Sequence, residues 1–189
     1  QEVAGYADVM NLIFENYREI PLSENYIKQL HKVLLKYSTK DLRHSGEYKI
    51  SFNNIEAFDQ SGDSLGIIFE TSSPFNTPIE MAELVKRTSY QLETDEVHPL
   101  ITIADFIVRF LAIHPFMDGN GRISRALTTL LLLRANYIYV PYASIESVIE
   151  ENKDSYYKAL RKTQKKLDSN DDNWLLFFLK TLKRQVEIL

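Results

Sequence analysis

Apolar residues recur every three or four positions along most of this chain, the spacing that places them on one face of an α-helix. The pattern therefore predicts a mainly helical protein. Residues 100–113 are apolar nearly all round, which is typical of a helix buried in the centre of a bundle. The helices that we expect span residues 2–18, 24–34, 77–92, 100–113, 122–135, 144–150, 152–167 and 174–182.

Local signals mark where two of these helices begin. Ser23 precedes the apolar positions of the second segment and can accept a hydrogen bond from a main-chain N–H of the first turn. Thr77 is followed by Pro78 and Glu80, the combination of an N-cap, a proline in the first turn and an acidic third position. His31 lies on the apolar face of the second helix, so we expect it to be packed and hydrogen-bonded and not reactive.

Between residues 45 and 74 the pattern changes to short β-branched and aromatic runs separated by turn residues. Tyr48–Phe52 and Ile67–Phe69 predict strands of a small hairpin, with a polar tip at Asp59–Ser64. A single hairpin beside several helices adds little to a core. We therefore expect a flap whose exposed edge near residues 66–75 pairs with an extended target protein, although a plain structural hairpin fits the pattern equally well.

Length and composition bound the protein further. The 189 residues contain no internal repeat, linker or low-complexity tract, so we expect a single domain over residues 1–189. A net charge of −4 argues against a nucleic-acid partner. The chain has no cysteine, no apolar run of membrane-spanning length and no visible secretion signal, so we expect no membrane association and a cytoplasmic location.

Candidate chemistry concentrates between His114 and Arg125, in the sequence His-Pro-Phe-Met-Asp-Gly-Asn-Gly-Arg-Ile-Ser-Arg. Gly119 and Gly121 let main-chain N–H groups approach a ligand, and the apolar run behind them predicts that a helix begins here. The unpaired N–H groups and positive dipole of a helix N-terminus suit an anion. Arg122 lies on the same helix face as Arg125. The stretch therefore predicts a phosphate site, although the Walker and Rossmann glycine patterns are both absent.

This stretch resembles the signature of the Fic family, His-x-Phe-x-Asp/Glu-Gly-Asn-Gly-Arg-x-x-Arg, at every specified position. The resemblance covers about residues 20–185, because the hairpin region and the C-terminal aromatic segments also look like a Fic domain. It implies a helical bundle around the central buried helix and the signature helix, with residues 1–20 as an N-terminal helical extension and the hairpin as a flap. It also implies an enzyme that moves AMP from ATP to a Ser, Thr or Tyr hydroxyl of a target protein and releases pyrophosphate.

The resemblance also implies roles for individual residues. His114 is expected to be the general base that deprotonates the target hydroxyl. Asp118 is expected to hold Mg²⁺, a hard ion that prefers carboxylate and phosphate oxygens, and Phe116 to be a packing anchor that sets the loop. The phosphates are expected to contact the main chain of Gly119, Asn120 and Gly121, the Asn120 side chain, Arg122 at the β-phosphate and Arg125 at the γ-phosphate.

The adenine pocket is expected in a Tyr-Tyr-x-x-Leu stretch. In similar family members these residues flank the base, and here they are Tyr156, Tyr157 and Leu160. Gln164 stands where relatives often have Asn, which puts its contact with the base in doubt. A tyrosine pair packed only for stability remains an alternative.

Regulation is expected at Arg125. Many Fic proteins carry an inhibitory helix, Ser/Thr-x-x-x-Glu-Gly/Asn, whose Glu pairs with the second signature arginine. Ser147–Asn152 matches this pattern and Asn11–Asn16 matches it without the Ser/Thr. The opening Gln-Glu-Val-Ala-Gly-Tyr resembles the segment that follows such a helix in one branch of the family, so we expect the inhibitory helix to be trimmed from this chain.

Other interpretations stay open at this stage. Fic-type transfer can move UMP, phosphate or phosphocholine in place of AMP, although two signature arginines favour a triphosphate. A nucleotide- or peptide-binding module with little catalysis is a second class. A metal hydrolase that uses His114 and Asp118 as ligands is a third, but it needs a further ligand that the sequence does not supply.

Overall fold

Two adjacent helices, α4 (Pro99–Ile113) and α5 (Asn120–Arg134), form the centre of the protein. The computed structural model describes residues 2–38, 42–58, 64–164, 167 and 172–189. Within this part of the chain, most residues of both α5 and α4 are buried. The prediction of a buried central helix at residues 100–113 is therefore confirmed.

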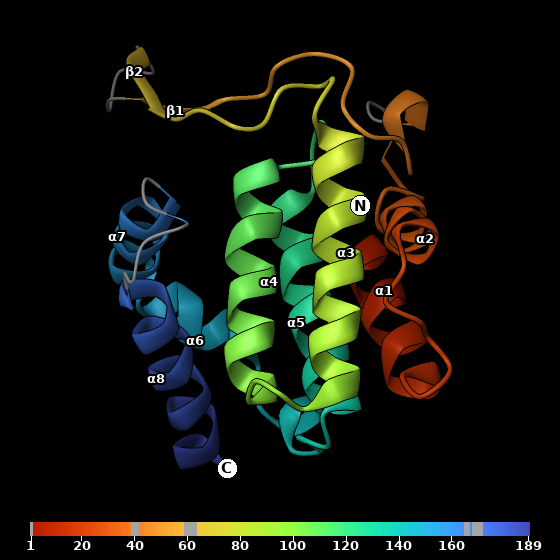
Figure 1. Cartoon of the computed structure of the whole chain (residues 1–189), viewed down its shortest axis with the longest axis vertical. Helices are drawn as coiled ribbons and strands as arrows, with labels where there is room; N and C mark the ends of the chain where they lie inside the picture. The colour runs from red at the N-terminus through yellow and green to blue at the C-terminus, as the bar shows by residue number, and fades with distance from the viewer. Residues whose placement is uncertain (1, 39–41, 59–63, 165–166, 168–171) are drawn as a thin grey trace.

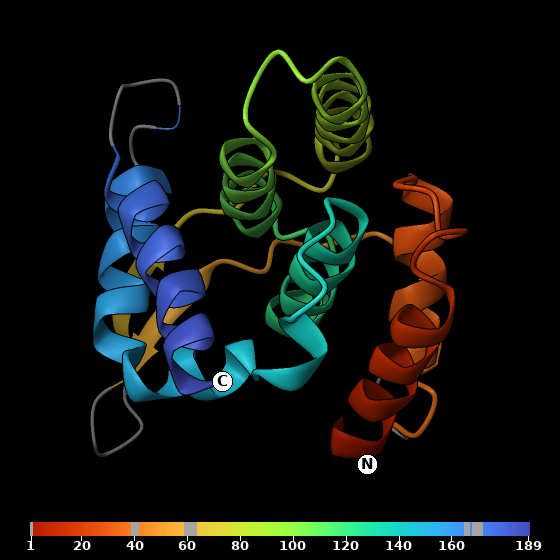
Figure 2. The ribbon, with the colours of Figure 1, turned by 90° about the horizontal axis from the view of Figure 1, so that it is seen from below.

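The surrounding helices are α1 (Glu2–Asn16), α2 (Glu24–Leu34), α3 (Thr77–Thr94), α6 (Ile145–Glu151), α7 (Lys153–Gln164) and α8 (Asn173–Ile188), with short 3-10 turns at Leu42–His44 and Val140–Tyr142. Helices α1 and α2 lie on one side of this central pair and α6 to α8 on the opposite side, while α3 packs against α4 (Figures 1 and 2). Trp174 ties one side to the centre, because its Nε1 donates a 2.7 Å hydrogen bond to the carbonyl of Ala104 in α4. The mainly helical architecture agrees with the prediction.

Helices α1 and α2 approach each other closely at Gly5. A Cβ atom at this position would lie 1.9 Å from the main-chain oxygen of Leu34. Only a residue without a side chain lets the two backbones pack this tightly. The contact fixes the N-terminal helix against the rest of the bundle.

The predicted start of α2 is confirmed, and that of α3 needs a correction. Ser23 Oγ accepts a 3.2 Å hydrogen bond from the main-chain N–H of Tyr26. In α3, however, Thr77 is already helical and Asn76 is the N-cap, without a side-chain cap bond. The Thr77 hydroxyl instead donates to the carbonyl of Ser73 at 2.8 Å, so the competing loop contact moves the cap by one residue.

A small antiparallel sheet extends above the bundle (Figure 1). Strand β1 (Ile55–Phe58) pairs with β2 (Ser64–Phe69), with irregularities in register at two points. Residues 59–63 of the expected polar tip lie outside the described residues.

The segment Tyr48–Phe52, predicted as a strand, does not form one. Its main chain turns instead toward the loop after α4, where the N–H of Lys49 donates a 2.8 Å hydrogen bond to the carbonyl of Pro115. A pairing partner on another loop replaces the partner strand, so the β-like composition does not produce a sheet here.

None of the helices among the described residues is both long enough and apolar enough to cross a membrane.

Candidate active site

The loop between α4 and α5 begins at His114, which ends α4 in a left-handed conformation (φ 53°, ψ 60°). This conformation is uncommon for a residue with a side chain and is often found where a functional group must be aimed. The His114 N–H still bonds to the carbonyl of Phe110 at 2.9 Å, so the last helical turn stays closed. The chain therefore changes direction at His114, where the signature loop begins.

His114 has the protonation state of a base. Its Nδ1 lies 3.3 Å from the carbonyl of Leu111, which can only accept, so Nδ1 carries the proton and Nε2 is the unprotonated nitrogen. Burial lowers the pKa of His114 from 6.5 to about 4, with a smaller lowering from Lys49 and opposing effects of the Leu111 bond and Asp118. The imidazole is therefore neutral at pH 7 and can take up a proton at Nε2.

Phe116 is the packing anchor of the loop. Its side chain is fully buried and its ring stacks on His31, with 3.8 Å between ring centroids and 6° between planes. His31 Nδ1 accepts from the N–H of Gly46 at 2.9 Å, so its Nε2 carries the proton and donates to the carbonyl of Asp118 at 3.0 Å. His31 is thus buried and hydrogen-bonded, as predicted. It also holds the signature loop through the Asp118 carbonyl and the Phe116 ring.

Asn120 needs a correction. We expected its side chain on the phosphates, but its Oδ1 accepts from the Phe116 N–H at 2.9 Å and its Nδ2 donates to the Phe116 carbonyl at 2.7 Å. The side chain is buried and closes the loop on itself. Gly119, the N-cap of α5 at φ 77°, provides no side-chain cap. The first N–H groups of α5 therefore receive no hydrogen bond from an N-cap side chain, and such a helix start suits an anion.

Two arginines on the first turns of α5 carry buried donors. Arg122 Nη1 and Arg125 Nε make no hydrogen bond within the described part of the chain. The carboxylate of Glu2 lies 3.4 Å from Arg122 Nη1, and that of Glu146 lies 3.8 Å from Arg125 Nε. Because a buried donor without an acceptor is costly, both guanidinium groups are suited to bind the oxygen atoms of an anion.

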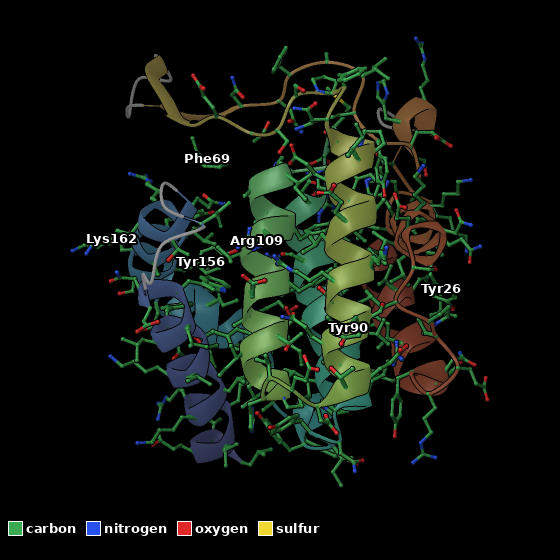
Figure 3. All side chains as sticks on the ribbon, viewed as in Figure 1. Tyr26, Phe69, Tyr90, Arg109, Tyr156 and Lys162 are labelled. Atoms are coloured by element: carbon green, nitrogen blue, oxygen red, sulfur yellow. The ribbon has the colours of Figure 1, made fainter. Side chains whose placement is uncertain are left out.

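A cavity of about 470 Å³ lies beside His114. This volume is in the range of small-molecule sites. Phe69 reaches it from the end of β2; Figure 3 shows this ring below the hairpin, on the side of α7 and Tyr156. Of the predicted site residues, those in its lining are His114, Gly121, Arg125, Tyr156, Tyr157 and Leu160. Those outside its lining are Phe116, Asp118, Gly119, Asn120 and Arg122.

Both tyrosines of the pair line the cavity, and one of them is also packed into the core. Tyr156 is buried against Trp174, with 5.9 Å between ring centroids, and it also lines the cavity. Tyr157 is half exposed and lines the same cavity, together with buried Leu160. The pair therefore supports the helix packing and provides an apolar wall.

Four lining residues were not assigned by the sequence. They are Phe69, Leu111, Arg161 and Gln164, whose contact was left in doubt. The helical spacing from Tyr157 to Arg161 and on to Gln164 contains a signal for two of them, because residues three and four apart share a face. Phe69 carries no such signal, because its place depends on where the hairpin crosses the bundle.

One acidic residue, Asp118, stands at the signature loop. Its carboxylate is half exposed and its Oδ2 accepts from Arg122 Nη2 at 3.0 Å. Among the described residues no group of three or more His, Asp or Glu side chains is placed to hold a metal ion. Asp118 therefore fits an ion that takes one protein carboxylate and completes its shell with water and ligand oxygens, which is the habit of Mg²⁺.

Neither glutamate of the two inhibitory-pattern matches forms an ion pair with Arg125 among the described residues, although Ile149 of the stretch Ser147–Asn152 lines a small cavity together with Arg125. Glu151 lines a different depression, between α6, α7 and α8, and Glu15 is exposed on α1. Among the described residues, the carboxylate within ion-pair distance of Arg125 is that of Glu146, at the start of α6, which also accepts a hydrogen bond from the Tyr6 hydroxyl. An inhibitory role for either matched stretch has no support in this arrangement.

The chain is similar in sequence to proteins with Fic or Fido domains. The chain is 40% identical over 63 residues to the Protein adenylyltransferase Fic of Drosophila grimshawi, which covers 32% of this chain and 13% of the fly protein. It is 34% identical over 99 residues to a Fido domain-containing protein of Dictyostelium discoideum, which covers 50% of this chain and 64% of that protein. The chain thus spans less than two thirds of the length of these relatives.

Among solved structures, a Fic domain-containing signaling protein from Bacteroides thetaiotaomicron superposes with a TM-score of 0.73 at 26% identity. The superposition covers 97% of this chain and 67% of that one. The model of the Fic/DOC family matches residues 21–132, which is more than half of the chain and includes the whole signature loop. The chain therefore belongs to the Fic/DOC family.

Proposed function

We propose that this protein transfers AMP from ATP to a Ser, Thr or Tyr hydroxyl of a target protein. The observation that carries the proposal is the union, around one cavity, of a neutral His114, Arg125 and the apolar wall of α7. A base, an anion-binding end and a flat apolar end are what a nucleotide with a reactive phosphate requires. The name of the fly relative, an adenylyltransferase, supports the same chemistry.

In the proposed complex the nucleotide lies along the cavity. The adenine ring packs against Tyr157 and Leu160, and the phosphates lie on the uncapped start of α5. Arg122 donates to the β-phosphate and Arg125 to the γ-phosphate, which supplies acceptors for Arg122 Nη1 and Arg125 Nε, two nitrogens that make no hydrogen bond among the described residues. Gly121 leaves room for the Arg125 side chain. A Cβ atom at this position would lie 3.3 Å from Arg125 Nη1 and would require the guanidinium to shift slightly.

Mg²⁺ fits the proposal through Asp118. A single carboxylate beside the phosphate-binding loop is sufficient for an ion that shares its shell with phosphate oxygens. When bound, the ion would neutralise part of the phosphate charge. Arg122, which bonds to the same carboxylate at 3.0 Å, keeps Asp118 oriented along the loop.

The proposed reaction is an in-line displacement at the α-phosphorus. Nε2 of His114 takes the proton of the target hydroxyl as its oxygen bonds to the α-phosphorus. The bond from the α-phosphorus to the bridging oxygen breaks, and pyrophosphate leaves with the electron pair. AMP is then joined to the target by a phosphodiester link. The protein contributes position and charge, which are the main sources of rate in phosphoryl transfer.

The target is proposed to dock on the hairpin side of the cavity, near residues 66–75. In this protein β2 ends at Phe69 in the cavity lining, so a chain paired along the hairpin is led toward His114. Main-chain pairing of this kind accepts many sequences. The proposal therefore specifies the geometry of the target segment and not its identity.

Labelled ATP tests the proposed function. The protein is incubated with lysate and Mg²⁺, with the label on the α-phosphate in one reaction and on the γ-phosphate in the other. AMP transfer puts the α-label, and not the γ-label, on protein. Transfer of the γ-label would indicate phosphate transfer, and tight ATP binding without either label would indicate a binding module; both results would overturn the proposal.

A further inference from the structure

A buried polar cluster lies directly behind the catalytic loop. We call Lys49, Asn53 and Thr71 the polar clasp. The Lys49 side chain is buried, and its Nζ donates to Asn53 Oδ1 at 2.9 Å and to Thr71 Oγ1 at 2.9 Å. The Thr71 hydroxyl in turn donates to Asn53 Oδ1 at 2.9 Å. The three side chains therefore form a closed set of hydrogen bonds.

The polar clasp holds the main chain of the catalytic loop at four consecutive residues. Lys49 Nζ donates to the carbonyl of Ile113 at 2.8 Å, and the Lys49 N–H donates to that of Pro115 at 2.8 Å. Asn53 Nδ2 donates to the carbonyls of His114 and Phe116 at 3.2 and 2.6 Å. Every carbonyl from Ile113 to Phe116 is thus fixed by a donor of the clasp.

The charge state of Lys49 agrees with this arrangement. Its Nζ meets three acceptors, which matches the three N–H groups of an ammonium. Burial lowers the pKa of Lys49 to about 8, while Glu80 opposes this. The side chain therefore remains mostly charged at neutral pH, and charge-assisted bonds hold the loop more firmly than neutral ones.

The clasp also connects the loop to both ends of the hairpin. Lys49 and Asn53 come just before β1, and Thr71 comes two residues after β2. The two connecting segments run above the ends of α3 and α4 (Figure 1). The hairpin on which we place the target and the loop that carries His114 are therefore connected through the same three residues.

We propose that Lys49, Asn53 and Thr71 are positioning residues that set the left-handed His114 at a fixed place relative to the hairpin. This inference rests on the proposed AMP transfer. The clasp touches no reacting atom; it acts through the four loop carbonyls. Because His114 adopts a conformation that a free chain rarely takes, loss of these bonds lets the ring move while the helices remain packed.

The variant Asn53→Asp tests this directly. It keeps the size of the side chain and the oxygen that Lys49 and Thr71 contact, but it replaces the donor to the loop carbonyls by an acceptor. Asn54→Asp is the matched control, because Asn54 accepts from the Thr71 N–H at 3.1 Å through its oxygen, which an aspartate keeps, and donates to no loop carbonyl among the described residues. The two variants differ in charge from the wild type by the same amount.

We expect Asn53→Asp to lower the rate of α-label transfer at saturating ATP by roughly tenfold or more, because small displacements of a catalytic group are costly. The affinity for ATP and the melting temperature should remain close to those of Asn54→Asp. A transfer rate within about twofold of the control would contradict the proposal. If Asn53→Asp does not fold, Thr71→Val, with Thr71→Ser as the rescue, carries the same test.

A second readout separates this inference from the proposed function. The NMR signal of the His114 imidazole in nucleotide-free protein should shift in Asn53→Asp and stay unchanged in Asn54→Asp. If the wild type transfers no label, the proposed function fails, and this signal alone decides whether the clasp positions His114. An unmoved signal in Asn53→Asp would overturn the inference whatever the activity.

Discussion

Protonation of His114 gives a sharp prediction about pH. In the folded protein burial lowers the pKa of this imidazole to about 4, against 6.5 in an ordinary environment. Between these two values only the unfolded chain takes up the proton. Lowering the pH from 6.5 toward 4 therefore lowers the free energy of unfolding. Above pH 6.5 His114 is mainly neutral in both the folded and the unfolded chain, so this loss of stability is absent.

The size of the effect follows from the two pKa values. At about pH 5 the unfolded chain gains about 2 kcal/mol from protonation of His114 relative to pH 7, and the limiting value at still lower pH is about 3 kcal/mol. The variant His114→Gln lacks this group. The difference in unfolding free energy between wild type and variant should thus shift by about 2 kcal/mol between these two pH values.

Urea unfolding of both proteins at the two pH values measures this shift. NMR titration of the imidazole signals gives the pKa itself, with His114→Gln identifying which of the four histidines is His114. A parallel pH dependence of the two proteins, or a titration of His114 near 6.5, would refute the view that burial keeps the base neutral. The low-pH limb of transfer activity should likewise fall well below pH 6.5.

Three further changes test other parts of the structure. Gly5→Ala should destabilise the fold by about 1–3 kcal/mol in urea unfolding, because its Cβ would overlap the Leu34 carbonyl; unchanged stability would refute the close packing of α1 on α2. Asp118→Asn should abolish Mg²⁺-dependent α-label transfer while the melting temperature stays the same, since the carboxylate is half exposed; full activity would remove it as the proposed ligand. His31→Leu should cost about 2–4 kcal/mol of stability, because the Gly46 N–H and the Asp118 carbonyl both lose their partner, and a neutral effect would contradict that assignment.

Much of the fold is present in the sequence as local pattern. The helices follow from apolar spacing because most of them bury one face, and Ser23 caps α2 as its residue type predicts. The misplaced features are those set by distant contacts. Thr77 does not cap α3, because its hydroxyl donates to the carbonyl of Ser73. Tyr48–Phe52 is not a strand, because the N–H of Lys49 bonds to the loop after α4.

The site shows the same division. The signature identifies the loop residues that cluster at the start of α5, and the resemblance of Tyr156, Tyr157 and Leu160 to the Tyr-Tyr-x-x-Leu stretch of family members points to the wall of the cavity. Neither could show that Asn120 folds its side chain back onto Phe116 or that Phe69 reaches the cavity from the hairpin. These contacts join segments far apart in the chain, and one sequence contains no record of such pairings.

The measurement that tests the central claim most directly is α-label transfer by His114→Ala with ATP affinity measured on the same protein. His44→Ala, at a histidine in the short turn after α2 and outside the cavity lining, is the control. The account predicts that His114→Ala binds ATP as the wild type does and transfers no AMP, while His44→Ala does both. Undiminished transfer by His114→Ala would show that His114 is not the base and would contradict the mechanism.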